Sequence, residues 1–294
     1  MKNFLIAIVI IVLIILGIYY FRGSNKGVTG ELVPTATSTI TVATSTLANK
    51  EMTVIGQSVE GRDITAYHYG TGADEILLVG GLHGGYEWNT VSLAYEIMDY
   101  LKANPNIIPT NLKVTVIPVL NPDGLTKTVG TAGRFTAADV PAAGTEAGRF
   151  NANKVDLNRN FACDWQTSGK WQSKTVSGGT AAFSEPETVA VKNYIESNKP
   201  KAVVAYFSAA GGVYSSNCHT GVLPETKLLT SAYAQASGYP AFAEFDFYET
   251  TGDFTNWLAK EGTPSISVLL TNHSNTEWAK NKAGVEALLK YYTK

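Results

Sequence analysis

The sequence predicts an α/β domain whose central sheet is mixed and largely parallel, with helices on both faces. Short apolar runs typical of buried strands recur between residues 51 and 294, and amphipathic stretches lie between or after them. Strands that alternate with helices indicate a largely parallel sheet. The chain of 294 residues has a formal net charge of -2 and no basic cluster, which excludes a nucleic-acid-binding surface.

The N-terminal end is expected to be a single-pass membrane anchor. After a short tail over residues 1–3, residues 4–21 form an unbroken apolar run that is just long enough to cross a bilayer. A signal peptide is the rival interpretation, but its apolar core is usually shorter, and no small-residue cleavage site closes this run. We therefore expect one transmembrane helix.

Residues 22–50 are expected to form a flexible linker. They are rich in Thr, Ser and Ala and carry almost no charge, which is typical of a tether. A short edge strand near residues 40–42 is the alternative. The remaining residues, 51–294, suffice for one compact domain with a full core.

Hydrophobic periodicity predicts the elements of this domain. Continuous apolar runs indicate buried strands, and apolar residues along one face indicate helices. The expected strands are residues 76–79, 114–120, 202–206 and 266–270, and the expected helices are residues 90–103, 185–197 and 282–292. Ligands bind beyond the carboxyl ends of strands in such sheets, which is where we expect His83, Asn121 and Phe207.

The segment at residues 156–161 is suited to binding a carboxylate. The planar guanidinium of Arg159 can bind both carboxylate oxygens at once, and the amide of Asn158 can donate a further bond. Arg149 lies ten residues upstream, and its charge would suit a carbonyl oxygen that becomes an oxyanion. A solvated surface residue is the simpler interpretation of Arg149 alone.

His83 and Glu87 form a plausible pair of zinc ligands. They follow the apolar run at residues 76–79, at a strand end just before a helix. Gly84 and Gly85 lie between them and can adopt backbone angles that are closed to other residues.

The motifs of the chain resemble those of one enzyme family in their order. Besides the segments above, they are residues 56–64, 116–124 and 183–188. Together they resemble the zinc carboxypeptidase family, the M14 metallocarboxypeptidases, along nearly all of residues 51–294. The resemblance implies a zinc carboxypeptidase-like fold, one zinc ion, and zinc-dependent hydrolysis of C-terminal peptide bonds.

The resemblance also implies roles for individual residues. His83 and Glu87 would be the first two zinc ligands. Arg159 with Asn158 would clamp the terminal carboxylate of the substrate, and Arg149 would stabilise the oxyanion.

Two further positions match the family's substrate pocket. Tyr248 matches the tyrosine that closes over the bound C-terminus, and Thr255, seven positions later, matches the specificity residue. A neutral Thr255 offers no counter-charge for Lys or Arg side chains, so basic-residue specificity is not expected.

Three features depart from the family. Phe207 stands where the third zinc ligand should be a histidine, and Leu269 stands at the position of the catalytic glutamate. Three residues rather than two separate His83 from Glu87. A positioned general acid/base contributes about a hundred- to ten-thousand-fold in rate, and catalytic zinc normally has three protein ligands, so efficient hydrolysis is not expected.

Other residues could replace the missing groups. Among the remaining histidines, we expect His219 to be the one most able to reach the metal, although a lone loop histidine is more often a surface residue. For the missing base, the candidates are Glu244, Glu249 and Asp253.

Cys163 and Cys218 are the only cysteines, and each closely follows a proposed site motif. A disulfide between them would join two segments that converge on one cleft, and it would require an oxidising compartment. Two buried free thiols are the alternative. With the membrane anchor, we expect a disulfide and a domain held at the cell membrane outside the cytoplasm.

Three functions remain open. The preferred one is a membrane-anchored family member that has lost or strongly reduced its catalysis but still binds the C-termini of peptides or peptidoglycan stem peptides. The first alternative is an active metallocarboxypeptidase that acts on extracellular or cell-wall peptides with a non-standard third ligand and base. The second alternative is a structural scaffold, and the retained carboxylate clamp favours binding over it.

Overall fold

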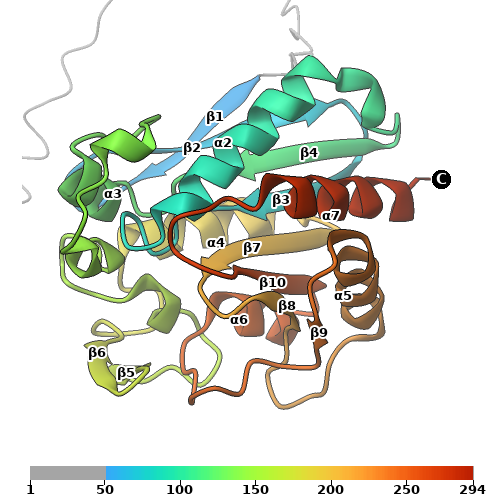
Figure 1. Cartoon of the computed structure of the whole chain (residues 1–294). Coiled ribbons are helices and arrows are strands. Elements are labelled where there is room, and N and C mark those ends of the chain that lie inside the picture. Colours follow the sequence, from blue (N-terminus) through green and yellow to red (C-terminus); the bar gives the residue numbers. More distant parts are fainter. Residues whose placement is uncertain (1–50, 294) are drawn as a thin grey trace, which may run out of the picture. The chain divides into compact units, whose positions relative to one another are not determined.

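The computed structural model describes residues 51–293, and an eight-stranded mixed sheet forms their centre (Figure 1). The strand order is β1-β2-β4-β3-β7-β10-β8-β9. The strands are β1 (Met52–Gln57), β2 (Asp63–Gly70), β3 (Asp74–Val79), β4 (Leu112–Ile117), β7 (Ala202–Ser208), β8 (Gly212–Ser215), β9 (Ala241–Phe242) and β10 (Ser265–Leu270).

The middle of the sheet is parallel and its flanks are mixed. Strands β4, β3, β7 and β10 pair in parallel, whereas β2 pairs antiparallel with β1 and β4, and β8 pairs antiparallel with β10. All six residues of β10 are buried, as expected for a strand covered on both faces. The expected mixed, largely parallel sheet is confirmed, and the carboxyl ends of β3, β7 and β10 share one edge.

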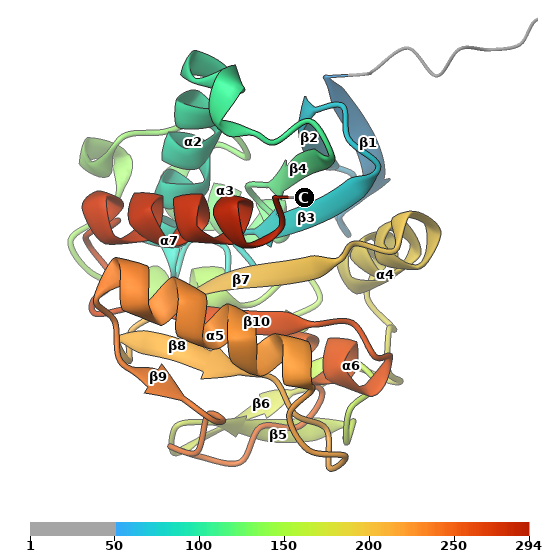
Figure 2. The same cartoon turned by 90° about the vertical axis from the view of Figure 1, so that its right-hand side faces the viewer.

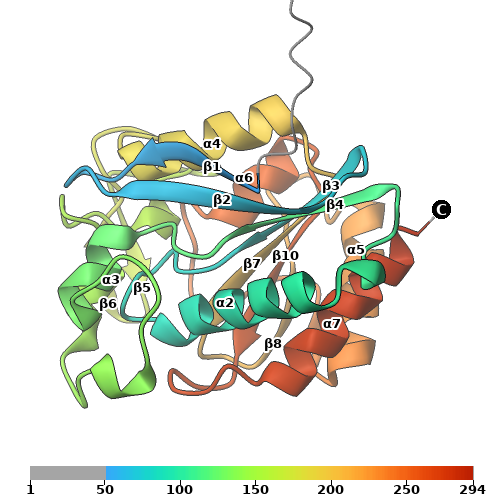
Figure 3. The ribbon, with the colours of Figure 1, turned by 90° about the horizontal axis from the view of Figure 1, so that it is seen from above.

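Helices cover both faces of the sheet (Figures 2 and 3). One face packs against α2 (Trp88–Ala103), α5 (Pro224–Ser237) and α7 (Trp278–Tyr291), and the other packs against α4 (Pro186–Asn198) and α6 (Phe254–Lys260). Side chains of β3 alternate between the two cores, since Ile76 and Leu78 enter the first and Leu77 and Val79 enter the second.

The expected elements exist, with some boundaries shifted. The strand expected at residues 114–120 ends at Ile117, before Pro118, which has no N–H to donate to a ladder. Helices α2 and α7 begin at Trp88 and Trp278, earlier than expected. Unanticipated elements include β1, β2, β8, β9, α3 (Pro122–Val129), α5, α6, and the hairpin of β5 (Ser168–Trp171) and β6 (Lys174–Ser177).

Short 3-10 helices carry part of the site. Arg149 ends η3 (Thr145–Arg149), and Asn158 and Arg159 belong to η4 (Leu157–Arg159). The other two are η1 (Pro105–Ile107) and η2 (Ala137–Asp139).

The expected transmembrane helix at residues 4–21 and linker at residues 22–50 lie outside the described residues. Within residues 51–293, no helix combines the length and apolarity needed to cross a membrane.

Candidate functional site

A cavity of about 710 Å³ lies beyond the carboxyl ends of β3, β7 and β10. This is the edge at which sheets of this kind bind ligands. Its walls include His83, Glu87, Arg149, Asn158, Arg159, Phe207, Tyr248, Thr255 and Leu269. Asn121, expected at the same edge, is buried, donates to Arg149 O and does not line the cavity.

His83 and Glu87 converge in the wall of this cavity. Nδ1 of His83 lies 3.0 Å from Oε1 of Glu87, and both side chains are buried. The extra residue between them is accommodated at Gly84, whose φ of +43° and close approach to Gly148 leave no room for a Cβ atom. Within residues 51–293, neither nitrogen of His83 has an aligned hydrogen-bond partner. His83 and Glu87 therefore each offer a donor atom for a metal ion.

Arg149 and Asp156 form a buried ion pair behind His83 and Glu87. Nε of Arg149 donates to Oδ2 of Asp156 at 2.8 Å, and Oδ1 of Asp156 lies 3.3 Å from Nε2 of His83. Burial alone would raise the pKa of the Asp156 carboxyl, but the charge of Arg149, the contact with His83 and the charge of Arg159 hold this pKa well below its usual range. Nη1 of Arg149 is also 3.8 Å from Oε1 of Glu87, so Arg149 compensates two buried carboxylates.

Arg159 is a buried cation without a carboxylate partner. The residue is only 1% exposed, and no Asp or Glu oxygen of residues 51–293 lies within ion-pair distance of it. Its guanidinium donates to two backbone carbonyls, Lys170 O from Nε and Nη2, and Asn158 O from Nη1. A guanidinium has five N–H groups, so two remain for a ligand in the cavity.

Asn158 and Asp253 are joined in the same wall. Nδ2 of Asn158 donates to Oδ2 of Asp253 at 2.8 Å, and Oδ1 of Asn158 accepts from Phe254 N. The other oxygen of Asp253 accepts from Oγ1 of Thr255 and from Asn256 N, which caps α6. Asp253 lines the cavity and has no cationic partner within residues 51–293. A negative charge therefore lies beside Thr255, a placement that the sequence did not predict.

Aromatic rings form another wall. The Tyr248 ring lies beside Arg159, with 5.9 Å between the guanidinium carbon and the ring centroid. Burial raises the pKa of the Tyr248 phenol, and the charge of Arg159 opposes part of that rise. The Tyr214 ring stacks on Phe242 at 4.7 Å and meets Phe245 at 5.6 Å. Of these rings, those of Tyr214, Phe245 and Tyr248 line the cavity and give it an apolar side.

Phe207 and Leu269 are neighbours on adjacent strands, paired in the parallel register of β7 and β10. The Phe207 ring lies 5.5 Å from the His83 imidazole, measured between centroids. Both residues line the cavity, and neither side chain carries a lone pair or a titratable proton. The cavity therefore has a continuous apolar patch next to His83.

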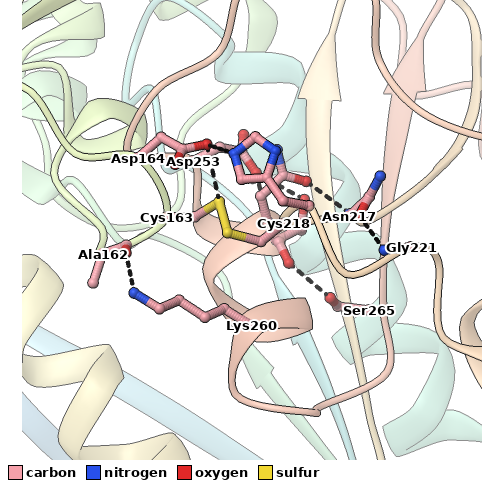
Figure 4. The surroundings of a disulfide bond; sticks show 12 residues. Ala162, Cys163, Asp164, Asn217, Cys218, Gly221, Asp253, Lys260 and Ser265 are labelled. Atoms are coloured by element: carbon pink, nitrogen blue, oxygen red, sulfur yellow. Dashed lines mark hydrogen bonds and ion pairs between the residues drawn. A yellow bond between two sulfur atoms is a disulfide. The ribbon is translucent and has the colours of Figure 1, made fainter.

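The structure joins Cys163 to Cys218 in a disulfide, with a Cα–Cα distance of 6.1 Å (Figure 4). The bond connects the segment after η4 to the loop after β8. Two walls of the cavity are thus linked covalently outside the cavity itself.

Comparison with known proteins identifies the family. The model of the family described as "Zinc carboxypeptidase" matches residues 41–292. The chain belongs to the zinc carboxypeptidase family.

Several relatives share parts of the sequence. Carboxypeptidase Z of Rattus norvegicus is 31% identical over 123 residues, which are 36% of this chain and 17% of that protein. Murein peptide amidase A of Vibrio campbellii is 31% identical over 140 residues, 44% of this chain and 53% of the relative. The chain thus spans less than two thirds of the length of these relatives.

Solved structures share the fold. The murein-tripeptide amidase MpaA from Escherichia coli O157 aligns with a TM-score of 0.57 at 22% identity, covering 83% of this chain and 93% of the other. Bovine thrombin-activatable fibrinolysis inhibitor aligns with a TM-score of 0.64 at 18% identity, covering 82% and 87%. Identities this low show a common fold alone.

The family is zinc-dependent, but the donors in this cavity do not fit a catalytic zinc ion. Such an ion takes three protein ligands, and among residues 51–293 no group of three His, Cys, Asp or Glu donors forms around His83 and Glu87. Phe207, which the sequence resemblance places at the third ligand, has no lone pair for a metal. Within residues 51–293, the one group of three or more metal-binding side chains lies elsewhere, at Cys163 and its neighbours.

The expectation that His219 is the histidine most able to reach this point is wrong. Its side chain is 76% exposed, contacts Asp164 and does not line the cavity. The reason is the direction of β8, which runs antiparallel to β10 and carries the chain away from the carboxyl edge. His273, which follows β10, lines the cavity instead, and its ring lies 4.6 Å from that of Tyr86.

His273 is partly buried in the cavity wall. Burial lowers the pKa of its imidazole, and its Nδ1 has no hydrogen-bond partner in the described chain. Of the three residues considered as a substitute base, Glu244 and Glu249 are exposed and lie outside the cavity walls, whereas Asp253 is in them. Asp253 is already held by its three hydrogen bonds to Asn158, Thr255 and Asn256.

Proposed function

We propose that this protein binds the free C-termini of peptides and has lost or strongly reduced the hydrolysis typical of its family. The observation that carries the proposal is Arg159, a buried cation that lines the cavity and has no carboxylate partner in residues 51–293. Burying a charge without a partner costs free energy. A ligand carboxylate that pairs with Arg159 would therefore stabilise the protein, and the same contact would add to the affinity of the ligand.

The cavity supplies a complete set of contacts for such a ligand. The terminal carboxylate lies against Arg159 beneath the Tyr248 ring, and the preceding carbonyl faces Arg149. The last side chain enters the region of Thr255 and Asp253. Because Asp253 supplies the negative charge that Thr255 lacks, this region accepts a cationic side chain as well as a neutral one.

The loss of hydrolysis follows from the apolar patch. Phe207 cannot bind a metal, and Leu269 cannot exchange protons with water. Without a positioned acid/base, the rate falls by about a hundred- to ten-thousand-fold, even where a peptide is correctly bound. A two-donor site would also hold zinc loosely.

The proposed ligands are peptides and peptidoglycan stem peptides outside the cytoplasm. Similarity to murein peptide amidases supports the second class. The apolar run at residues 4–21 supports attachment to the cell membrane, and the Cys163–Cys218 disulfide supports an oxidising location.

The test is calorimetry with two peptides of one sequence, one ending in a free carboxylate and one in an amide. The proposal predicts that the free acid binds and remains intact, and that the amide binds at least about 100-fold more weakly because it cannot form the charged contact. Equal binding of the two peptides, or binding of neither, would refute it.

A second candidate is an active carboxypeptidase with an unusual ligand set. The observation in its favour is His273, which lines the cavity and has a buried Nδ1 without a partner. This candidate predicts zinc-dependent release of the C-terminal residue that is abolished by His273→Ala. The proposed binding function predicts no release from either protein.

A further inference from the structure

The disulfide is surrounded by further groups that can bind a metal ion (Figure 4). Asp164 directly follows Cys163, and His219 directly follows Cys218. Both Sγ atoms and a carboxylate oxygen of Asp164 lie within 4.8 Å of one another. Nε2 of His219 contacts Oδ2 of the same carboxylate. Two sulfurs and one carboxylate oxygen therefore lie together, and the imidazole nitrogen of His219 adjoins that carboxylate from outside the group.

The backbone brings these side chains together. Asp164 and His219 have φ angles of +50° and +61°, in the left-handed region that few residues other than glycine adopt. The two side chains contact each other. The residue directly after each cysteine thus has the same unusual backbone conformation, and in both loops that residue carries a side chain that can bind a metal.

Contacts other than the disulfide also hold the two loops. Lys260 donates to Ala162 O at 2.9 Å, next to Cys163. Asn217 accepts from Gly221 N at 3.1 Å and closes the loop that contains His219. The loops thus have supports that remain when the S–S bond is broken.

We propose that, when the disulfide is reduced, Cys163, Cys218, Asp164 and His219 bind one zinc ion. Zinc prefers four-coordinate sites built from thiolate, imidazole and carboxylate, with Zn–S distances of about 2.3 Å and Zn–N or Zn–O distances of about 2.0–2.2 Å. The two Sγ atoms and the Asp164 oxygen already lie within 4.8 Å of one another, the Cα–Cα distance of the cysteines is 6.1 Å, and His219 contacts Asp164, so side-chain movements can bring the four donors into such a geometry.

The chemistry balances with an external dithiol as the reductant. The dithiol attacks the Cys163–Cys218 bond, passes through a mixed disulfide, and leaves as its own cyclic disulfide, while the protein gains two thiols. Zinc then displaces the two thiol protons and binds the thiolates. Two electrons move from the dithiol to the protein sulfurs, and the zinc ion keeps its oxidation state.

The site would preserve a cross-link between the walls of the peptide cavity. Cys163 O accepts from Gly252 N at 2.7 Å, and Gly252 O accepts from Phe161 N at 3.0 Å. Gly252 precedes Asp253, which lines the cavity. The metal would therefore replace the covalent link in a reducing environment. This inference is independent of the proposed peptide binding.

The test compares oxidised and reduced forms of the same full-length protein. Protein reduced with a water-soluble phosphine, and oxidised protein as the control, are titrated with cobalt(II) and then with zinc in the absence of oxygen. We expect the reduced form to bind one equivalent more than the oxidised form, with thiolate-to-cobalt charge-transfer absorption that zinc displaces. Asp164→Asn and His219→Asn should each weaken this extra binding by at least about 10-fold, since even ligand-supporting residues contribute that much.

Two variants serve as controls. The double variant Cys163→Ser, Cys218→Ser should bind no extra metal, and His83→Asn, which removes a donor from the cavity, should keep the full reduction-dependent equivalent. The proposal is overturned if reduction adds no metal, or if the extra equivalent is lost in His83→Asn. It is also overturned if Asp164→Asn and His219→Asn, shown by circular dichroism to be folded, bind zinc as tightly as the unaltered reduced protein.

Discussion

Replacement of Arg159 by alanine should remove the distinction between a peptide acid and its amide. Arg159 has two N–H groups available to a ligand, and hydrogen bonds to charged groups contribute about 1.5–3 kcal/mol each. The coupling between Arg159 and the terminal carboxylate should therefore be at least about 3 kcal/mol. That energy corresponds to about 100-fold in Kd.

The assay is a thermodynamic cycle measured by calorimetry. The unaltered protein and Arg159→Ala are each titrated with the free peptide and the amidated peptide, so that effects of the substitution on the rest of the protein cancel. Arg134→Ala is the matched control, because Arg134 is exposed and pairs with Asp99 on the surface. It should retain full discrimination. The reasoning is refuted if Arg159→Ala still prefers the free acid by more than a few-fold.

Three other predictions follow from the charges and the apolar patch of the cavity. Asp156→Asn should lower the free energy of unfolding by about 3 kcal/mol at pH 7, because it breaks a buried ion pair. Since the folded-state pKa of Asp156 is depressed, its stabilisation is fully present above the unfolded pKa of about 3.9 and is lost progressively as the pH falls from there through the lower folded-state pKa. Urea unfolding at several pH values should therefore show the two proteins converging below about pH 4, and a constant difference would contradict this. Asp253→Asn should weaken binding of a Lys-terminated peptide several-fold and leave binding of a Leu-terminated peptide unchanged, as measured by competition; equal losses would mean that Asp253 only caps α6. The double variant Phe207→His, Leu269→Glu should retain zinc through dialysis and release C-terminal residues, measured by metal analysis and peptide mass, whereas continued inactivity with zinc bound would show that further groups are missing.

The central strands and the main helices could be predicted because their apolar residues follow clear patterns. β3 and β7 contain apolar runs of at least four residues, and β10 is apolar except for its two serines, a composition typical of strands covered on both faces. The edge strand β1 and the hairpin of β5 and β6 were not recognised, because their residues are largely exposed and lack a clear pattern. Helix α5 is short of apolar residues on a single face, so its periodicity is weak.

The site residues could be placed together from their motifs, but their surroundings could not. His273 enters the cavity because the loop after β10 is held by Asn89, whose side chain donates to Asn272 O and Asn275 O. These bonds link residues 183 and 186 positions apart in the sequence, so no local pattern reveals them. The direction of β8 likewise depends on pairing with β10, and it places His219 far from its expected position.

Asp253 shows the same limit in another way. The sequence suggests Asp253 only as a substitute base, and the structure shows that its side chain caps α6. Its position beside Thr255 in the cavity depends on the bond from Asn158, which comes from a segment 95 positions away in the chain. The position of Asp253 beside Thr255 was therefore not predictable from its own segment.

The most direct measurement is to follow one C-terminally free peptide with the full-length protein and added zinc, recording its binding by calorimetry and its mass over time. We predict that the peptide is bound and keeps its mass, because Phe207 has no lone pair for a metal and Leu269 has no titratable proton. Release of the C-terminal residue that stops when a chelator is added would contradict this account and show that the protein is an active carboxypeptidase.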